Sequence, residues 1–183
     1  VEYKKTVFNS TLGMIGKFQA YNVLASASIC IALGMDPNFV FRALPYLKAA
    51  RGRMEIVPSK NSNSTVIIDY AHTPEALRSV LSFLKEMKIT NGKLITLFGC
   101  GGDRDKDKRK LMGNIAHKYS DTVIITDDNP RNENPAKIRS DILSGSPSAI
   151  EISDRNKAIK HAVSILSEND FLLIAGKGHE TLQ

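Results

Sequence analysis

Hydrophobic and polar positions change their spacing near residue 50 of the chain. Before that point, apolar residues recur at helical spacing from Phe18 to Gly34, a glycine placed where helices commonly end. Asp36 and Pro37 then have the pattern of an N-cap and a first helical position, and they predict a second, short helix towards Leu47. A proline late in that segment should bend or end this helix.

Beyond residue 50, short apolar runs alternate with amphipathic stretches. The runs predict strands near residues 55–57, 65–69, 93–99, 122–126, 149–152 and 171–175. The amphipathic stretches predict helices near residues 74–87, 108–119, 135–143 and 156–166. Strand–helix alternation with continuously apolar strands predicts an α/β fold with a mostly parallel sheet that is covered on both faces.

We predict a domain boundary between residues 50 and 51. Residues 1–50 are too few and too one-sided to hold a core alone, so we interpret them as the helical tail of another domain. Residues 51–183 form the α/β domain, and no closing helix follows its last predicted strand. We therefore expect the chain to be part of a longer protein, cut at both ends.

Composition narrows the class of protein. The 183 residues are 42% hydrophobic and 24% charged, as in globular proteins, and the apolar runs are too short to cross a membrane. No signal-peptide pattern is present, and Cys30 and Cys100 are too few for a zinc cluster. We expect a cytoplasmic protein without membrane insertion.

The net charge of +6 is compatible with anionic ligands. Its densest basic stretch, residues 104–110, is interleaved with aspartates, and the chain is only 7% aromatic with no tryptophan. Nucleic-acid grooves usually combine unbroken basic stretches with stacking aromatics, so we expect no nucleic-acid partner.

Candidate chemistry lies in the loops that follow four predicted strands. In open α/β sheets, ligands bind beyond the carboxyl ends of the strands. The four loops are polar or rich in glycine, and they cover residues 69–74, 99–105, 127–131 and 176–180. One such loop would be an ordinary surface turn, whereas four at one edge of a sheet favour a ligand site.

The residues in these loops allow several roles. Glycines in the 99–105 loop let the backbone approach a ligand closely, yet neither a dinucleotide fingerprint nor a P-loop is present. His72 and His179 could be acids, bases or metal ligands, without a metal-binding spacing. Arg104 and Arg131 could each hold a carboxylate or phosphate with a guanidinium fork.

Taken together, the four loops resemble the C-terminal half of the Mur ligases, of the diaminopimelate-adding MurE type. Their sequences are D-Y-A-H-T-P, G-C-G-G-D-R-D, D-N-P-R and G-K-G-H-E, in that order along the chain. The stretches 16–25 and 52–55 add to the resemblance, which covers nearly the whole chain. It implies a Rossmann-like C-terminal ligase domain preceded by the helical tail of a central ATP-binding domain.

The resemblance also implies an activity. Such ligases add meso-diaminopimelate to a UDP-muramoyl dipeptide by way of an acyl phosphate, and they convert ATP to ADP and phosphate. We expect ATP and Mg2+ as cofactors and a monomeric full-length enzyme of peptidoglycan synthesis. The P-loop, the magnesium ligands, a modified lysine and a UDP-binding domain would lie upstream, so we expect the chain alone to be inactive.

The resemblance implies particular site residues in this sequence. The residues for phosphoryl transfer would lie upstream of it. On the nucleotide side the implied site residues are Asn22, Arg53, Asp69 and His72, with Arg53 near the phosphates. On the amino-acid side they are Arg104, Asp128, Asn129, Pro130, Arg131, Gly176 and Glu180. In this family the D-N-P-R motif marks diaminopimelate, so we expect Arg131 to pair with its distal carboxylate and Glu180 to balance its distal ammonium. Alternatively, Arg131 pairs only with Glu133 or Asp128 on the surface.

Two departures from the family pattern bear on these assignments. Residues 106–110 are K-D-K-R-K, where the family usually has x-G-K-R-P, and this should alter the entry from loop to helix. Gln19 stands where asparagine is common. A different class of protein, a non-catalytic amino-acid or nucleotide-binding domain, could reuse the same fold. Residues 1–50 favour the ligase, because they fit the tail of an ATPase domain.

Overall fold

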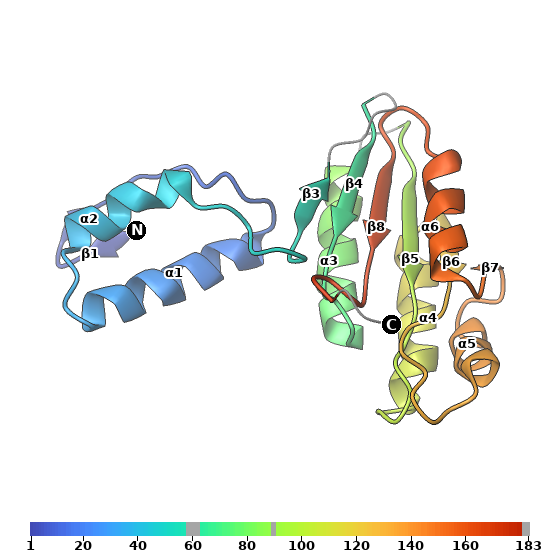
Figure 1. The fold of residues 1–183 in the computed structure, drawn as a ribbon. Helices are drawn as coiled ribbons and strands as arrows, with labels where there is room; N and C mark the ends of the chain where they lie inside the picture. The colour runs from blue at the N-terminus through green and yellow to red at the C-terminus, as the bar shows by residue number, and fades with distance from the viewer. Residues whose placement is uncertain (58–62, 89–90, 181–183) are drawn as a thin grey trace. The chain divides into compact units, whose positions relative to one another are not determined.

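The computed structural model describes residues 1–57, 63–88 and 91–180. The chain divides into two compact units, Val1–Ala50 and Arg51–Gln183. The first unit contains a short hairpin and helices, and the second contains the main sheet (Figure 1).

The first unit has a small hydrophobic core of its own, contrary to the expectation that residues 1–50 cannot hold one. Its elements are β1 (Glu2–Tyr3), β2 (Thr6–Val7), α1 (Lys17–Ala32), α2 (Pro37–Ala43) and the 3-10 helix η1 (Leu44–Tyr46). Val23, Phe41 and Leu44 are its buried centre, and the rings of Phe8 and Phe41 stack with centroids 4.3 Å apart. Asp36 caps α2 by accepting two backbone hydrogen bonds. The late proline ends α2 as expected, because a 3-10 turn replaces the α-helix there.

The second unit is built on a six-stranded sheet of order β3-β4-β8-β5-β6-β7. The strands are β3 (Glu55–Val57), β4 (Thr65–Ile68), β5 (Leu94–Phe98), β6 (Thr122–Ile125), β7 (Ile150–Glu151) and β8 (Phe171–Ile174). Only β3 among the paired strands of this sheet runs antiparallel to its neighbour. The predicted mostly parallel α/β fold is therefore confirmed.

Helices cover both faces of this sheet. They are α3 (Pro74–Met87), α4 (Asp107–Tyr119), α5 (Pro135–Leu143) and α6 (Arg155–Ser164). Helix α6 covers one face and α3 and α4 cover the other, while α5 packs beside α4 (Figure 1). Side chains Thr73, Asn134 and Asp154 cap α3, α5 and α6, so each of these helices begins directly at a strand-end loop or a short turn.

The central strands explain why the core forms. Every residue of β5 is buried, as expected for a strand covered on both faces. On the α6 face, Leu97 and Leu172 pack with Ala158 and Ala162, whose small side chains let the helix approach the sheet. Burial of this kind contributes about 1.5–3 kcal/mol for each large apolar side chain.

Candidate functional site

The four polar loops predicted from the sequence meet at one edge of the sheet. Strands β4, β8, β5 and β6 are parallel neighbours, so their carboxyl ends lie together. The register pairs Ile68 and Leu97 with Ile174, and Phe98 with Ile125. The loops that follow these residues therefore start side by side.

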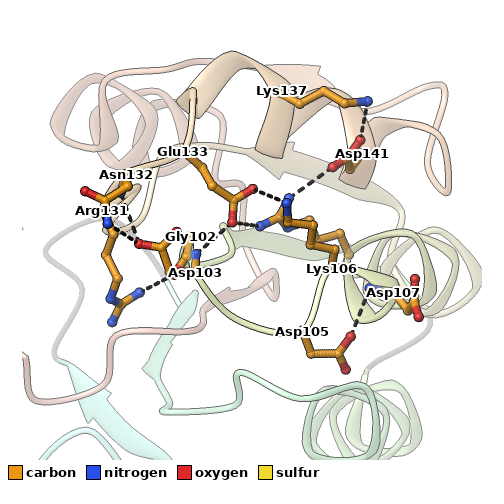
Figure 2. A network of polar contacts seen from close by, with 11 residues as sticks. Gly102, Asp103, Asp105, Lys106, Asp107, Arg131, Asn132, Glu133, Lys137 and Asp141 are labelled. Atoms are coloured by element: carbon orange, nitrogen blue, oxygen red, sulfur yellow. Dashed lines mark hydrogen bonds and ion pairs between the residues drawn. The ribbon is translucent and has the colours of Figure 1, made fainter.

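Two of these loops, here called the glycine loop (residues 99–106) and the arginine loop (residues 127–134), are joined by hydrogen bonds. The Gly102 amide donates to the Asn129 carbonyl at 2.8 Å, and Nη1 of Arg131 donates to the Gly102 carbonyl at 2.8 Å. A Cβ on Gly102 would lie 1.9 Å from the Pro130 carbonyl oxygen, so only glycine permits this approach. Figure 2 shows the contacts that Arg131, Asn132 and Glu133 make with Gly102 and Asp103.

Arg131 has a constrained backbone and an exposed side chain. Its φ is +50°, in the left-handed region that non-glycine residues rarely adopt. Among the described residues, its guanidinium has one hydrogen-bond acceptor, the Gly102 carbonyl, and no ion pair with Glu133 or Asp128. The predicted surface pair of Arg131 with either carboxylate is therefore not seen.

Glu133 is paired with Arg109 instead, a residue that the sequence analysis missed. Arg109 is fully buried in α4, and its guanidinium contacts Glu133 at 2.8 Å and Asp141 of α5 at 3.1 Å. The hydrogen bond from Arg109, together with one from the Asp103 amide, lowers the pKa of Glu133 to about 2. Glu133 therefore stays ionised at pH values well below the usual range for a glutamate.

Asp128 and Gly176 face each other across the edge. The Asp128 carboxylate accepts the Asn129 amide at 2.6 Å, and a Cβ on Gly176 would lie 3.4 Å from its other oxygen. Gly176 has φ +103°, which again favours glycine. Beneath them, the buried Arg155 donates to the Ala175 carbonyl at 2.9 Å, and burial lowers its pKa. Arg155 thus fixes the end of β8, and it too was missed.

Arg104 and Glu180 of the amino-acid set are exposed, as Arg131 is. The Arg104 side chain makes no hydrogen bond or ion pair with any residue in the described ranges. Glu180 accepts a hydrogen bond from the Tyr70 hydroxyl at 3.2 Å, which is the first cause of the raised pKa of Tyr70. These two charges are therefore placed to meet a ligand from solvent.

Aromatic side chains surround the predicted nucleotide residues of this unit. The guanidinium of Arg53 lies over the Tyr70 ring, 4.9 Å from its centroid. The Tyr70 ring also contacts the rings of His72 and His179, at centroid distances of 4.6 Å and 5.6 Å. An exposed guanidinium held against a ring fits a polyphosphate such as that of ATP.

Asp69 differs from the other nucleotide-side residues because it is buried. Its two carboxylate oxygens accept the backbone amides of Met54 and Ala71, each at 2.8 Å. Burial raises the pKa of Asp69, and those two amides and Arg53 act in the opposite direction. Asp69 thereby joins the entry of β3 to the loop after β4.

Asn22 belongs to the first unit, where its side chain donates to the Gln19 side chain at 3.2 Å. Its predicted nucleotide contact stays a prediction.

Across the described residues, no group of three or more His, Cys, Asp or Glu side chains could hold a metal ion. These residues do not fit a Mg2+ site of their own. No helix in the described ranges is long and apolar enough to span a membrane.

Comparisons with known proteins agree with this geometry. A family model described as "Mur ligase, glutamate ligase domain" matches residues 52–178. The chain is 49% identical over 180 residues to the UDP-N-acetylmuramoyl-L-alanyl-D-glutamate–2,6-diaminopimelate ligase of Caulobacter vibrioides, covering 98% of this chain and 37% of that protein. It is 50% identical over 172 residues to the enzyme of the same name from Rickettsia bellii, covering 93% of this chain and 35% of that protein.

A solved structure of an enzyme with that name also matches. It superimposes with a TM-score of 0.69 at 38% identity, and the match covers 94% of this chain and 36% of that one. The chain thus spans little more than a third of the length of the relatives it matches.

Proposed function

Because the chain belongs to the Mur ligase family, we propose that it forms the amino-acid-binding part of an ATP-dependent ligase that adds meso-diaminopimelate to UDP-N-acetylmuramoyl-L-alanyl-D-glutamate. The names of its relatives support this activity, and so does their identity of up to 50% across almost the entire chain. The chain spans about a third of those enzymes, so the complete reaction belongs to the full-length protein.

The observation that carries the proposal is a balanced set of charges at the carboxyl edge of the sheet. Meso-diaminopimelate has two carboxylates and two ammonium groups. Two guanidinium groups, Arg104 and Arg131, and two carboxylates, Asp128 and Glu180, come from loops at this edge. Lysine lacks the distal carboxylate, so it would leave one guanidinium without a partner. This complementarity favours diaminopimelate as the added amino acid.

Three further residues shape the amino-acid site. Asn129 and Pro130 present their carbonyls to the glycine loop, which fixes the direction of the following Arg131. Gly176 leaves room beside Asp128 for a bound ammonium. In the ligation, these residues would hold the amino acid so that its free amine meets the activated carboxyl group of the dipeptide.

The nucleotide side is proposed from weaker contacts. Arg53 would meet the phosphates of ATP, and we propose Asn22 and His72 as further ATP-binding residues. Asp69 would act through the loop that it holds. ATP supplies the phosphoryl group that activates the dipeptide carboxylate. We assign Mg2+ binding to other segments of the enzyme, and we further propose a cytoplasmic, monomeric protein.

The test is a ligation assay with the full-length protein, UDP-N-acetylmuramoyl-L-alanyl-D-glutamate and ATP. We expect ADP release that depends on meso-diaminopimelate and that is much slower with lysine at the same concentration. Binding of diaminopimelate without any ADP release would favour the non-catalytic binding domain. Equal rates with both amino acids would contradict the proposed specificity.

A further inference from the structure

The carboxylate of Glu133 connects a buried charge to the glycine loop. Its Oε1 accepts both the Asp103 amide at 2.7 Å and Nη2 of Arg109 at 2.8 Å (Figure 2). Its backbone amide donates to the Pro130 carbonyl at 3.0 Å. Glu133 therefore contacts the glycine loop, the arginine loop and helix α4 at one point.

Both loops hold a non-glycine residue in the left-handed region, Asp103 at φ +53° and Arg131 at φ +50°. Such backbones persist where surrounding contacts fix them. The carboxylate of Asp103 accepts two hydrogen bonds from Asn132, at 2.8 Å and 3.2 Å. The two strained positions are therefore held by the same set of contacts, with Glu133 between them.

Arg109 makes this set of contacts rigid, because a fully buried guanidinium with two carboxylate partners has little freedom to move. We propose that Arg109 and Glu133 are positioning residues that fix the guanidinium of Arg131 for the distal carboxylate of the added amino acid. The inference rests on the proposed function and adds residues that touch no substrate.

The second carboxylate of Arg109 provides a matched control. Asp141 accepts Nη1 of Arg109 at 3.1 Å across the α4–α5 contact, and it pairs with Lys137 of its own helix at 2.8 Å. Within the part of the chain that the structure describes, Asp141 makes no hydrogen bond or ion pair with the glycine loop or the arginine loop. Removing Asp141 or Glu133 weakens the same buried arginine, but only the loss of Glu133 releases the loops.

The experiment compares Glu133→Ala with Asp141→Ala in the full-length ligase. We expect the KM for meso-diaminopimelate to rise about tenfold or more in Glu133→Ala, and by less than about threefold in Asp141→Ala, because misplaced binding groups lose affinity. The kcat at saturating diaminopimelate and the KM for ATP should stay within about threefold of wild type in both variants.

Two conservative variants separate geometry from charge and serve if Glu133→Ala does not fold. Glu133→Gln keeps the length and an oxygen acceptor for the Asp103 amide, so the KM for diaminopimelate should stay within about threefold of wild type. Glu133→Asp keeps the charge but is one methylene shorter, so it cannot reach both partners, and the KM should rise about fivefold or more.

Amide hydrogen exchange supplies a readout that needs no activity. The Asp103 amide should exchange faster in Glu133→Asp than in wild type or Asp141→Ala. An equal rise in KM for Glu133→Ala and Asp141→Ala, or an unchanged KM in Glu133→Asp, would overturn the inference. A wild-type enzyme whose ADP release does not depend on diaminopimelate would instead overturn the proposed function. Failure of the inference and failure of the proposed function can therefore be told apart.

Discussion

The two ends of the ligand edge are built in different ways. At one end, backbone and side-chain hydrogen bonds join the glycine loop and the arginine loop, and the fully buried Arg109 anchors them through Glu133. At the other end, Asp69 is buried, but the exposed side chains meet more loosely: Arg53 lies over the Tyr70 ring, and Tyr70 donates a hydrogen bond of 3.2 Å to Glu180. The first end is preorganised before a ligand arrives, whereas the second can adjust to one.

One carboxylate at each end has a shifted pKa, and the two shifts have opposite directions and different causes. Hydrogen bonds from Arg109 and the Asp103 amide lower the pKa of Glu133, since they favour its charged form. Burial raises the pKa of Asp69, although two backbone amides oppose the shift. Rigid charge pairing thus marks the amino-acid end, and a buried carboxylate with amide partners marks the other.

The largest expected effect comes from Arg109→Met, which fills similar volume without charge. Two carboxylates would lose their buried partner, and the free energy of unfolding should fall by about 3 kcal/mol, the lower end of the range for broken buried pairs. The lower end applies because the side chains of Glu133 and Asp141 are 14% and 25% exposed and can rehydrate. Urea unfolding measures this, and an unchanged midpoint would show that Arg109 does not anchor the loops.

Alanine substitutions at the neighbouring residues Gly101 and Gly102 should have the next largest effects. A Cβ at Gly102 would meet the Pro130 backbone at 1.9 Å, so Gly102→Ala should separate the loops and cost about 1–3 kcal/mol of stability. A Cβ at Gly101 would clash with the end of the Arg131 side chain, at 2.7 Å, while the nearest backbone atom, the Asn129 carbonyl oxygen, lies at an ordinary contact distance of 3.6 Å. Gly101→Ala should therefore weaken diaminopimelate binding with little loss of stability. Equal melting temperatures for the two variants would contradict this difference.

The two ends should also differ in how the free energy of unfolding changes with pH under acidic conditions, here called the acid limb. Since the folded-state pKa of Glu133 is about 2, below its usual 4.5, its stabilisation is complete above pH 4.5 and is lost as the pH falls towards 2. Glu133→Gln should flatten this limb. The raised pKa of Asp69 acts in the opposite sense, so Asp69→Asn should steepen it. Chemical unfolding at several pH values between 2 and 5 measures both slopes, and parallel limbs in both variants and wild type would disprove the assignment.

The smallest effect is expected at the exposed end. Tyr70→Phe removes the hydrogen bond to Glu180 but keeps the ring that faces Arg53. Because Glu180 is exposed and can bind water instead, the unfolding free energy should change by about 0.5 kcal/mol or less. A change as large as that of Arg109→Met would show that this end is as rigidly built as the other.

Sequence patterns predicted the placement of the loops better than the contacts within them. Continuous apolar strands predicted a parallel sheet, and the parallel arrangement alone brings the polar loops to one edge. The Arg109 pairs were missed, because they join residues 24 and 32 positions apart through helix packing that no local pattern encodes. The same packing explains why Glu133 is not the partner of Arg131.

Helix ends show a similar limit. The K-D-K-R-K departure is compatible with helix α4. Asp107 is the first residue of α4, where the backbone amide dipoles favour a negatively charged side chain. The caps Thr73, Asn134 and Asp154 follow from familiar sequence patterns. No such pattern predicts that Asp69 is buried and hydrogen-bonded to the backbone. One of its partners is the amide of Met54, which lies fifteen residues earlier in the chain.

The central claim, that Arg131 selects the added amino acid, is tested most directly by Arg131→Ala in the full-length ligase. The measurement is kcat/KM for meso-diaminopimelate and for lysine in wild type and variant. The account predicts a loss of at least about tenfold for diaminopimelate, since an ion pair with its distal carboxylate disappears, and a far smaller loss for lysine. An equal loss for both amino acids, or no loss for diaminopimelate, would contradict it.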